Sequence, residues 1–440
     1  MKSLVILGLP WVRRTAAAFV ATLLVSASAS AATILVAKSG IDDPGCGSIR
    51  DSACLTIQYA INNSQPGDLI RIEPGVYPEL LTISQNLTLR GSKREKIIID
   101  GAQNGTVVTI NANVTATLER LTIRNGKALF MSGQPNAGGI LNNGTLTLRE
   151  CLVTRNTNSL PSDLAFGPQG GGIENSGVLT IDASDITYNN GTGQCLGAGG
   201  ILDQGQLAIK DSLIAYNTGG IIAGLCGGEG SPEIAGGAGV LVVGGVATID
   251  TTTVLQNDIS GGGFTISRST LNESPIEAYH GITVVNSTLY KSDIDAVFYE
   301  FAFDGYVEMS NSTMSKGKIV SVSDSYQFSP QPIGTIRDSV LAGCSGLFAS
   351  DDYNIVADST DCELTGGAHD YFGVSPDLGP LRFNGGPTKT MLPVRGSPAI
   401  DGGNPAGCHD SNGNRITVDQ RGFPRPNPDV GRCGVGAVQD

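Results

Sequence analysis

The sequence has little of what marks several common classes of protein. Its 440 residues include one Trp, three His, and 28 Lys and Arg against 41 Asp and Glu. Charges this sparse, beside 60 Gly, exclude a helical bundle and indicate a β-rich chain with many turns. Residues 32–440 carry 25 cationic and 41 acidic side chains, a formal charge of −16, which excludes nucleic-acid binding through general electrostatics. The apolar content of 40% argues against global disorder.

Long apolar runs are also missing. A membrane-spanning helix needs about 18 or more apolar residues, and the run from Thr15 to Val25 is shorter. This run follows the cationic Arg13 and Arg14 and precedes Ala29-Ser30-Ala31, a cleavage site of small residues. We interpret residues 1–31 as a signal peptide cleaved near Ala31, and we expect a secreted, extracellular or periplasmic protein with no transmembrane segment.

Nine cysteines in an exported chain favour disulfide bonds. Proximity in the sequence suggests four pairs, although sequence alone does not fix the connectivity. These pairs are Cys46 with Cys54, Cys195 with Cys226, Cys344 with Cys362, and Cys408 with Cys433. The remaining Cys151 aligns with serines of the repeat described next, which predicts a small buried thiol. The cysteine spacings do not predict a zinc site.

The middle of the chain consists of repeats that superpose without a gap. Each repeat alternates apolar and polar residues and ends on an Asn, and a small-residue motif such as Gly-Gly-Ile precedes it. The clearest copies run from Thr145 to Asn156, Val178 to Asn189, Gln206 to Asn217 and Val246 to Asn257. Weaker copies follow, so the alternation predicts short strands separated by turns over most of the chain.

The spacing between copies varies, but the extra residues always fall between the terminal Asn and the next glycine motif. Insertions at one corner of a repeat predict loops on one face. The spacing fits neither a β-propeller nor a leucine-rich repeat. It predicts a parallel β-helix, in which equivalent residues of stacked coils lie about 4.8 Å apart. One such ladder would consist of Asn125, Asn156, Asn189, Asn217 and Asn257. We expect this ladder to have a structural role, because Asn tolerates left-handed conformations and its amide can hydrogen-bond to the next coil.

The N-terminal part predicts a cap for the open end of this solenoid. Leu55 to Asn62 has helical spacing, and Gly67-Asp68 and Pro74 to Tyr77 follow as strand and turn. This stretch resembles the entry to right-handed parallel β-helix proteins of the pectin-lyase-like superfamily. The repeats are similar to the same superfamily, so the resemblance covers most of residues 33–342. It implies an all-β, right-handed parallel β-helix over residues 32–343, with an N-terminal helical cap at 32–80.

The C-terminal part contains five short motif blocks in order over about 60 residues. They are Asp377–Leu381, Asn384–Thr388, Gly396–Gly403, Asp419–Gly422 and Gly436–Val438. With these blocks the C-terminal part resembles the choice-of-anchor Q module of bacterial surface β-helix proteins. We therefore assign residues 344–440 to a C-terminal module closed by disulfides.

The superfamily resemblance also implies enzymes that act on acidic polysaccharides. The hydrolase motifs are incomplete here, since Tyr279-His280-Gly281 stands in place of Gly-His-Gly. A lyase needs a Lys or Arg base near carboxylate-bound calcium. The column after the core aliphatic offers Lys210 as a base between Asp182 and Asp250. The same column, which begins with Glu119 and Arg149, is also explained by a ladder of opposite charges on a solvated surface.

A second column lies just before the ladder Asn. It reads Arg124, Arg155, Tyr188, Tyr216 and Gln256. Aromatic faces and planar guanidinium groups suit sugar rings and their carboxylates, so Arg124, Arg155, Tyr188 and Tyr216 are candidate saccharide-binding residues. The alternative is that the tyrosines pack under the inserted loops.

Calcium is the one cofactor that the sequence suggests. Asp410, Asn412 and Asn414, with Asp419 further on, resemble a short calcium loop. Arg415 occupies the sixth position, where an EF-hand needs Gly, so an ordinary Asx-rich turn explains the same residues.

Two functions are consistent with these features. The first is recognition of a polysaccharide, a cell-surface glycan or another surface partner by a monomer, through loops on one face, as in an adhesin. The second is a polysaccharide lyase or hydrolase acting on uronate-containing polysaccharide. An enzyme requires a base and a charge-stabilising group in a cleft, whereas binding requires only a complementary surface.

Overall fold

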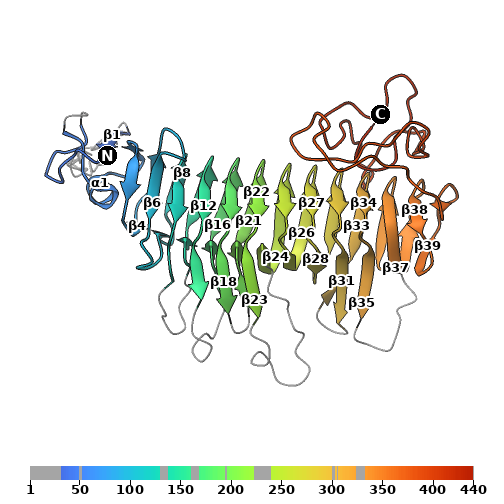
Figure 1. Ribbon diagram of the computed structural model, residues 1–440, viewed down its shortest axis with the longest axis horizontal. Coiled ribbons are helices and arrows are strands. Elements are labelled where there is room, and N and C mark those ends of the chain that lie inside the picture. The colour runs from blue at the N-terminus through green and yellow to red at the C-terminus, as the bar shows by residue number, and fades with distance from the viewer. Residues whose placement is uncertain are drawn as a thin grey trace, which may run out of the picture.

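The computed structural model describes residues 31–48, 52–128, 137–159, 168–193, 196–221, 239–299, 303–304, 306–323 and 332–439. Within them the chain winds into one elongated solenoid, with strands stacked along its long axis (Figure 1). One helix is present in this part of the chain, α1 (Ile57–Asn63). The expected all-β parallel β-helix with an N-terminal helical cap is confirmed. No helix in the described ranges has both the length and the apolar character needed to cross a bilayer.

Each coil contributes strands to three sheets, which we number in chain order. Sheet 1 contains β1 (Thr33–Val36), β2 (Asp68–Ile72), β5 (Leu87–Arg90), β8 (Thr115–Glu119), β11 (Thr145–Arg149), β16 (Val178–Asp182), β21 (Gln206–Lys210), β29 (Ile282–Val285), β33 (Val307–Ser310), β36 (Gly334–Arg337) and β39 (Cys362–Thr365). Sheet 2 contains β3 (Gly75–Tyr77), β6 (Ile97–Asp100), β9 (Thr122–Arg124), β12 (Leu152–Thr154), β17 (Asp185–Thr187), β22 (Leu213–Ala215), β25 (Thr253–Leu255), β27 (Thr270–Asn272), β30 (Thr288–Tyr290), β34 (Thr313–Ser315), β38 (Ile355–Asp358) and β40 (Tyr371–Phe372).

Sheet 3 contains β4 (Leu81–Ile83), β7 (Val108–Ile110), β10 (Ile140–Asn142), β15 (Ile173–Asn175), β20 (Ile201–Asp203), β28 (Ile276–Ala278), β31 (Ile294–Tyr299) and β35 (Ile319–Ser323). The long strands β24 (Val240–Asp250) and β26 (Ile259–Ser267) run from sheet 3 into sheet 1, and β37 (Val340–Ser350) pairs with strands of all three sheets. A short antiparallel pair joins β31 to β32 (Phe303–Asp304).

The alternation of apolar residues places one face of each strand inside the solenoid. On β11, Leu146 and Leu148 are buried, and on β16 they are matched in register by the buried Leu179 and Ile181. Full burial of one such side chain stabilises a fold by about 1.5–3 kcal/mol. Because every coil repeats this pattern, the core runs continuously along the solenoid.

The asparagine ladder lies at the corner between sheets 2 and 3. Asn156 donates from its backbone and side-chain amides to Oδ1 of Asn189, both at 3.0 Å, and Asn189 repeats the pattern with Asn217. The prediction was wrong for Asn125. The backbone N–H of Gly126, not of Asn125, donates to Oδ1 of Asn156, so Gly takes the ladder position on this coil.

The N-terminal end of the core is covered by α1. Thr56 caps the helix by accepting a hydrogen bond from the Tyr59 backbone N–H, as Thr commonly does at this position. Ile57, Ala60 and Ile61 are buried against the first coils. The apolar stripe of the helix therefore closes the end of the core that has no further coil to cover it.

At the corner where the sequence predicts inserted loops, three described segments add a small outer sheet, β13 (Thr157–Ser159), β18 (Asn190–Gly193) and β23 (Thr218–Ile221). A second outer pair consists of β14 (Pro168–Gly170) and β19 (Leu196–Ala198). Ala198 forms a separate apolar cluster with Leu202 and Leu241 on the outer side of sheet 3. These outer strands therefore cover part of sheet 3.

The solenoid continues past residue 343, where the C-terminal module was expected to begin. Buried Cys344 and Phe348 keep the inward apolar pattern on β37, which pairs with β38 and β39. Three predicted disulfides are confirmed, Cys46–Cys54, Cys344–Cys362 and Cys408–Cys433. The predicted partners Cys195 and Cys226 lie outside the described residues. Cys151 is buried and carries a free thiol.

Residues 373–439, which we call the C-terminal module, lie along sheet 2 of the later coils (Figure 1). Thr288 on β30 donates to Oε1 of Gln420 at 2.6 Å, and Thr313 on β34 accepts from the Ala437 backbone N–H at 2.9 Å. Thr270 on β27 donates to the carbonyl of Lys389. Outward threonines that would otherwise face water are therefore hydrogen-bonded to the module.

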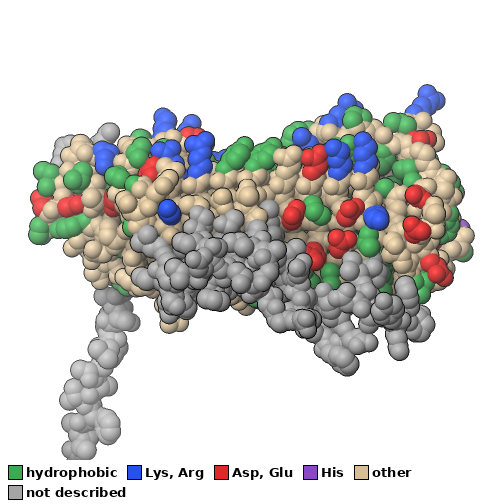
Figure 2. Space-filling view, turned by 60° about the horizontal axis from the view of Figure 1, so that its bottom comes forward, with side chains coloured by type: hydrophobic (Ala, Val, Ile, Leu, Met, Phe, Trp, Pro, Cys, Tyr) green, Lys and Arg blue, Asp and Glu red, His purple; other side chains and the backbone are tan. Residues whose placement is uncertain are grey.

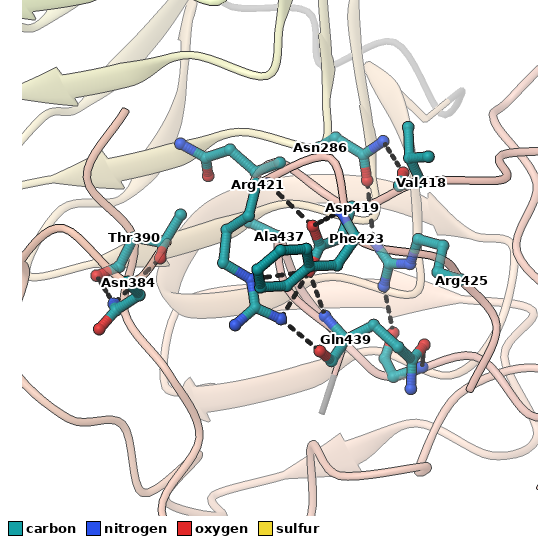
Figure 3. Close-up of polar contacts among 12 residues, drawn as sticks. Asn286, Asn384, Thr390, Val418, Asp419, Arg421, Phe423, Arg425, Ala437 and Gln439 are labelled. Atoms are coloured by element: carbon teal, nitrogen blue, oxygen red, sulfur yellow. Dashed lines mark hydrogen bonds and ion pairs between the residues drawn. The ribbon is translucent and has the colours of Figure 1, made fainter. Parts of the chain in front are cut away.

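A buried polar network holds the module together (Figure 3). Asp419 accepts hydrogen bonds from Arg421 and from the backbone N–H groups of Phe423 and Gln439. Arg425 is buried and donates to Oδ1 of Asn286 at 2.7 Å, which connects the module to the solenoid. The residues of the module are thus fixed relative to the coils beside them.

Candidate functional site

A row of outward side chains follows the corner between sheets 2 and 3, one position before the ladder. We call it the turn column. The strand register places its members on consecutive coils. After Asn125, they are Arg155, Tyr188, Tyr216, Gln256, Glu273, Lys291 and Lys316. All seven have positive φ, between 49° and 60°, and their side chains are exposed, or half-buried in the case of Glu273.

The centre of the turn column is an aromatic pair. The rings of Tyr188 and Tyr216 stack with centroids 5.2 Å apart and an interplanar angle of 17°. The two side chains are 58% and 40% exposed. A left-handed conformation costs a non-Gly residue about 1–2 kcal/mol, yet both tyrosines adopt it. With these exposed fractions the two rings form a platform, and the inserted loops of the alternative interpretation lie largely outside the described residues.

One arginine of the turn column, the exposed Arg155, lies on the coil before the aromatic pair. The prediction for Arg124 was wrong by one position, because the register pairs Arg124 with Thr154 and leaves Asn125 in the turn column. Arg124 instead donates to Asp100 at 2.9 Å. This guanidinium is engaged in a structural ion pair on sheet 2.

Polar groups continue the turn column on the other side of the tyrosines. Gln256 donates to Glu273 at 2.8 Å, and Lys291 lies 2.7 Å from the same carboxylate. These two contacts hold the pKa of Glu273 below its usual range. Lys316 donates to the Tyr290 hydroxyl at 3.0 Å. Along the upper edge of Figure 2, hydrophobic side chains lie between two groups of basic ones.

A pocket of about 550 Å³ lies where the turn column meets the C-terminal module. We call it the end pocket. From the solenoid it is lined by Asn272, Glu273, Tyr290, Ser315 and Lys316, and from the module by residues 375–381, Lys389 and Met391. Sequence reasoning missed this part of the site. The signal was present, since Ser274 and Ser292 continue the ladder after Asn257 and mark Glu273 and Lys291 as members of the column.

The charged column on sheet 1 has the predicted register. Arg149, Asp182, Lys210 and Asp250 lie opposite one another on successive coils. Arg149 lies 3.4 Å from Asp182, and Lys210 lies 3.4 Å from its chain neighbour Asp211. The column therefore contains the alternation of charge that a cross-strand ladder requires.

The carboxylate of Asp250 is hydrogen-bonded to residues on the next coil. It accepts hydrogen bonds from Ser267 at 2.7 Å and from Nε of Arg268 at 3.0 Å. Burial alone would raise the pKa of Asp250, but these bonds hold it below its usual range. Glu119 is likewise paired with Arg90 and Arg120. The carboxylates beside Lys210 are thus engaged by arginines.

The predicted calcium ligands do not converge. Asp410 accepts from the backbone N–H groups of Asn412 and Asn414 and from the Asn414 side chain, which makes an Asx turn. Asp419 is fully buried and paired with Arg421 at 2.7 Å. Backbone amides and an arginine already engage these carboxylates, which fits the Asx-rich turn, and calcium binding here stays a prediction. Among the described residues no group of three or more His, Cys, Asp or Glu is arranged to hold a metal.

Comparisons with known proteins leave the family open. No family model matches the sequence, and no curated protein matches it. The chain is similar in structure to XylC in complex with xylose, at 8% identity over 92% of this chain and 98% of that chain, with a TM-score of 0.43. It is also similar to pectate lyase Pel9A, at 15% identity over 93% and 97% with a TM-score of 0.40, and to a PL6 family polysaccharide lyase from Pseudopedobacter saltans, at 13% over 72% and 91% with a TM-score of 0.39. Similarity at this level assigns neither a ligand nor an activity to the chain.

Proposed function

We propose that this protein is exported and binds a polysaccharide along the turn column. The observation that carries the proposal is the exposed, stacked pair Tyr188 and Tyr216. Aromatic rings supply a large apolar face with little conformational freedom to lose, and a polar hydroxyl at the edge. The C–H face of a sugar ring suits the first property, and its hydroxyl groups suit the second.

The rigidity of the solenoid supports the same function. Tyr188 and Tyr216 each precede a buried ladder Asn, whose hydrogen bonds to adjacent coils fix the turn. Little entropy is therefore lost when a ligand binds. The members of the turn column repeat about every 4.8 Å along the solenoid, which offers an extended polymer a series of equivalent contacts.

The double variant Tyr188→Ala/Tyr216→Ala tests this function. A panel of neutral and acidic polysaccharides would be measured for retention on the immobilised protein, and we expect the variant to lose at least tenfold in affinity for the glycans that the parent binds. Tyr371→Ala is the matched control, since Tyr371 is similarly exposed but lies on β40 at the far end of the solenoid. Unchanged binding by the double variant would overturn the proposal.

A polysaccharide lyase is the second candidate function, with the register of Lys210 between Asp182 and Asp250 as the specific observation. Binding is favoured because the neighbouring carboxylates are already paired with arginines. Incubation with uronate-containing polysaccharide, with and without calcium, distinguishes the two. New absorbance of unsaturated uronate that Lys210→Ala abolishes would establish a lyase, and the appearance of reducing ends alone would indicate a hydrolase.

A further inference from the structure

The end pocket combines two cations with an apolar wall. Lys316 and Lys389 both line it. Lys316 contacts the Tyr290 hydroxyl and lies 5.1 Å from the centre of that ring, and Lys389 lies 5.6 Å from the ring of Phe383. No ion pair within the described residues involves either lysine. Two lysines without a carboxylate partner among the described residues therefore lie at this pocket.

The acidic residues of the end pocket are already engaged. Glu273 is bonded to Gln256 and Lys291, as described above. Asp377 accepts a hydrogen bond from the Ser375 hydroxyl at 2.7 Å and is exposed to water. The carboxylate of Glu273 is neutralised within the turn column, so the two lysines exceed the acidic charge left in the pocket.

The wall contributed by the C-terminal module places apolar side chains beside Lys389 and Asp377. Pro376, Leu378, Pro380, Leu381 and Met391 line it. A pyranose ring could rest against this wall while a charged substituent reaches the lysines. The pocket thus has the mixed character of ligand sites, in which apolar groups provide contact area and a few polar groups fix orientation.

We propose that the end pocket is the subsite for an anionic substituent, a carboxylate or a sulfate, on a sugar of the bound glycan. This inference rests on the proposed function and specifies its ligand. The chain is acidic overall, so its general field repels anionic polymers. A preference for them must therefore come from a local site such as this one, where ammonium groups make charge-assisted hydrogen bonds.

The distance along the solenoid sets a minimum ligand length. Tyr216 and Lys316 are separated by four coil steps, or about 19 Å. A ligand that contacts both the aromatic pair and the end pocket must span this distance. We expect short oligosaccharides to occupy one of the two and longer chains to occupy both, with higher affinity.

Two matched pairs of polymers test the subsite. Dextran and dextran sulfate differ by sulfate, and fully methyl-esterified and free polygalacturonate differ by carboxylate. Titration calorimetry gives the anionic-over-neutral affinity ratio for each pair. We expect the parent to prefer the anionic member of at least one pair, and Lys316→Met/Lys389→Met to reduce that ratio about tenfold, since hydrogen bonds to charged groups are the stronger kind.

The controls distinguish the effect of charge in the end pocket from an effect on folding and from the effect of charge elsewhere on the surface. Lys96→Met removes one exposed cation from the N-terminal coils and should leave the ratio unchanged, and Lys316→Arg/Lys389→Arg should preserve it. The inference is overturned if the parent prefers neither anionic polymer or if the methionine variant keeps the preference. In the second case, lost binding by Tyr188→Ala/Tyr216→Ala would still support the proposed function. If the parent binds none of the four polymers, both proposals fail for these glycans.

Discussion

Thr288 donates its hydroxyl proton to Oε1 of Gln420 across 2.6 Å, although the two residues are 132 positions apart in the sequence. Gln420 is itself buried, and its amide nitrogen lies 3.0 Å from the Ser269 carbonyl oxygen and from the hydroxyls of Thr270 and Thr388. One side chain of the module thus satisfies groups on two coils of sheet 2. The wall of the end pocket depends on this docking.

Gln420→Ala should weaken the docking of the C-terminal module. The variant leaves buried hydroxyl and carbonyl groups without partners, and each such group costs about 1–3 kcal/mol. We expect urea unfolding to show a loss of roughly 2–4 kcal/mol, and limited proteolysis to cut within residues 373–439 earlier than in the parent. Gln65→Ala, at an exposed position before β2, should match the parent in both measurements. Equal protease resistance would contradict the role assigned to Gln420.

Asp338 should make stability fall as pH rises from about 4 to about 7. Burial raises its pKa from 3.8 to about 7, even though Asn404 donates to Oδ1 and Arg425 and Arg337 act in the opposite direction. Asp351 adds a smaller increase. Between those two pH values the folded protein keeps a proton that the unfolded chain releases, so folding becomes less favourable as pH increases.

The difference between the folded and unfolded pKa of Asp338 limits this loss of stability to at most about 4 kcal/mol. Asp338→Asn removes the titrating group while keeping an oxygen for the Asn404 backbone N–H. Because other carboxylates such as Asp250 have lowered pKa values and the opposite dependence, the quantity to measure is the difference in unfolding free energy between parent and variant at each pH. A difference that stays constant between pH 4 and pH 8 would refute the prediction.

Asn217→Ala should destabilise the solenoid more than a neighbouring surface change. Asn217 accepts two hydrogen bonds from Asn189 and donates to the Ile186 carbonyl and to Asn257. Removing the side-chain amide leaves several buried polar groups without hydrogen-bond partners. The expected loss of stability is roughly 2–5 kcal/mol in total. Gln256→Ala, at an exposed turn-column position, should change stability by less than about 1 kcal/mol. Similar midpoints for the two variants in urea would show that the ladder is dispensable.

The strand register within the repeats could be predicted from the sequence, because it depends on a local pattern that recurs in every coil. The register of Arg149, Asp182, Lys210 and Asp250 follows from strand alternation, because equivalent positions of a repeat stack in a parallel β-helix. The errors arise where the repeat changes its residue type. Gly126 stands at a ladder position on one coil, and this shifted the expected place of Arg124 by one residue.

The contribution of the C-terminal module to the site was not predictable in the same way. Lys389 and Lys316 both line the end pocket although 72 residues of sequence lie between them. Such a contact depends on how the module packs across sheet 2, and buried side chains such as Gln420 and Arg425 determine that packing. Turn-rich sequence without periodicity carries no register from which to infer it.

Cys151 should be unreactive in the folded protein and replaceable by serine. Burial raises the pKa of its thiol to about 11, so at pH 8 iodoacetamide should modify it only after unfolding, as peptide mass spectrometry would show. The equivalent Ser184 and Ser212 each donate to the carbonyl two residues earlier, at 2.8 and 2.6 Å. Serine at 151 can donate to the Arg149 carbonyl in the same way, and we expect Cys151→Ser to cost less than about 1 kcal/mol. Cys151→Leu is the contrasting variant, because overpacking at this buried corner should cost about 1–3 kcal/mol. Rapid alkylation of the native thiol, or equal stability of the serine and leucine variants, would show that this corner is looser than the packing of Cys151 indicates.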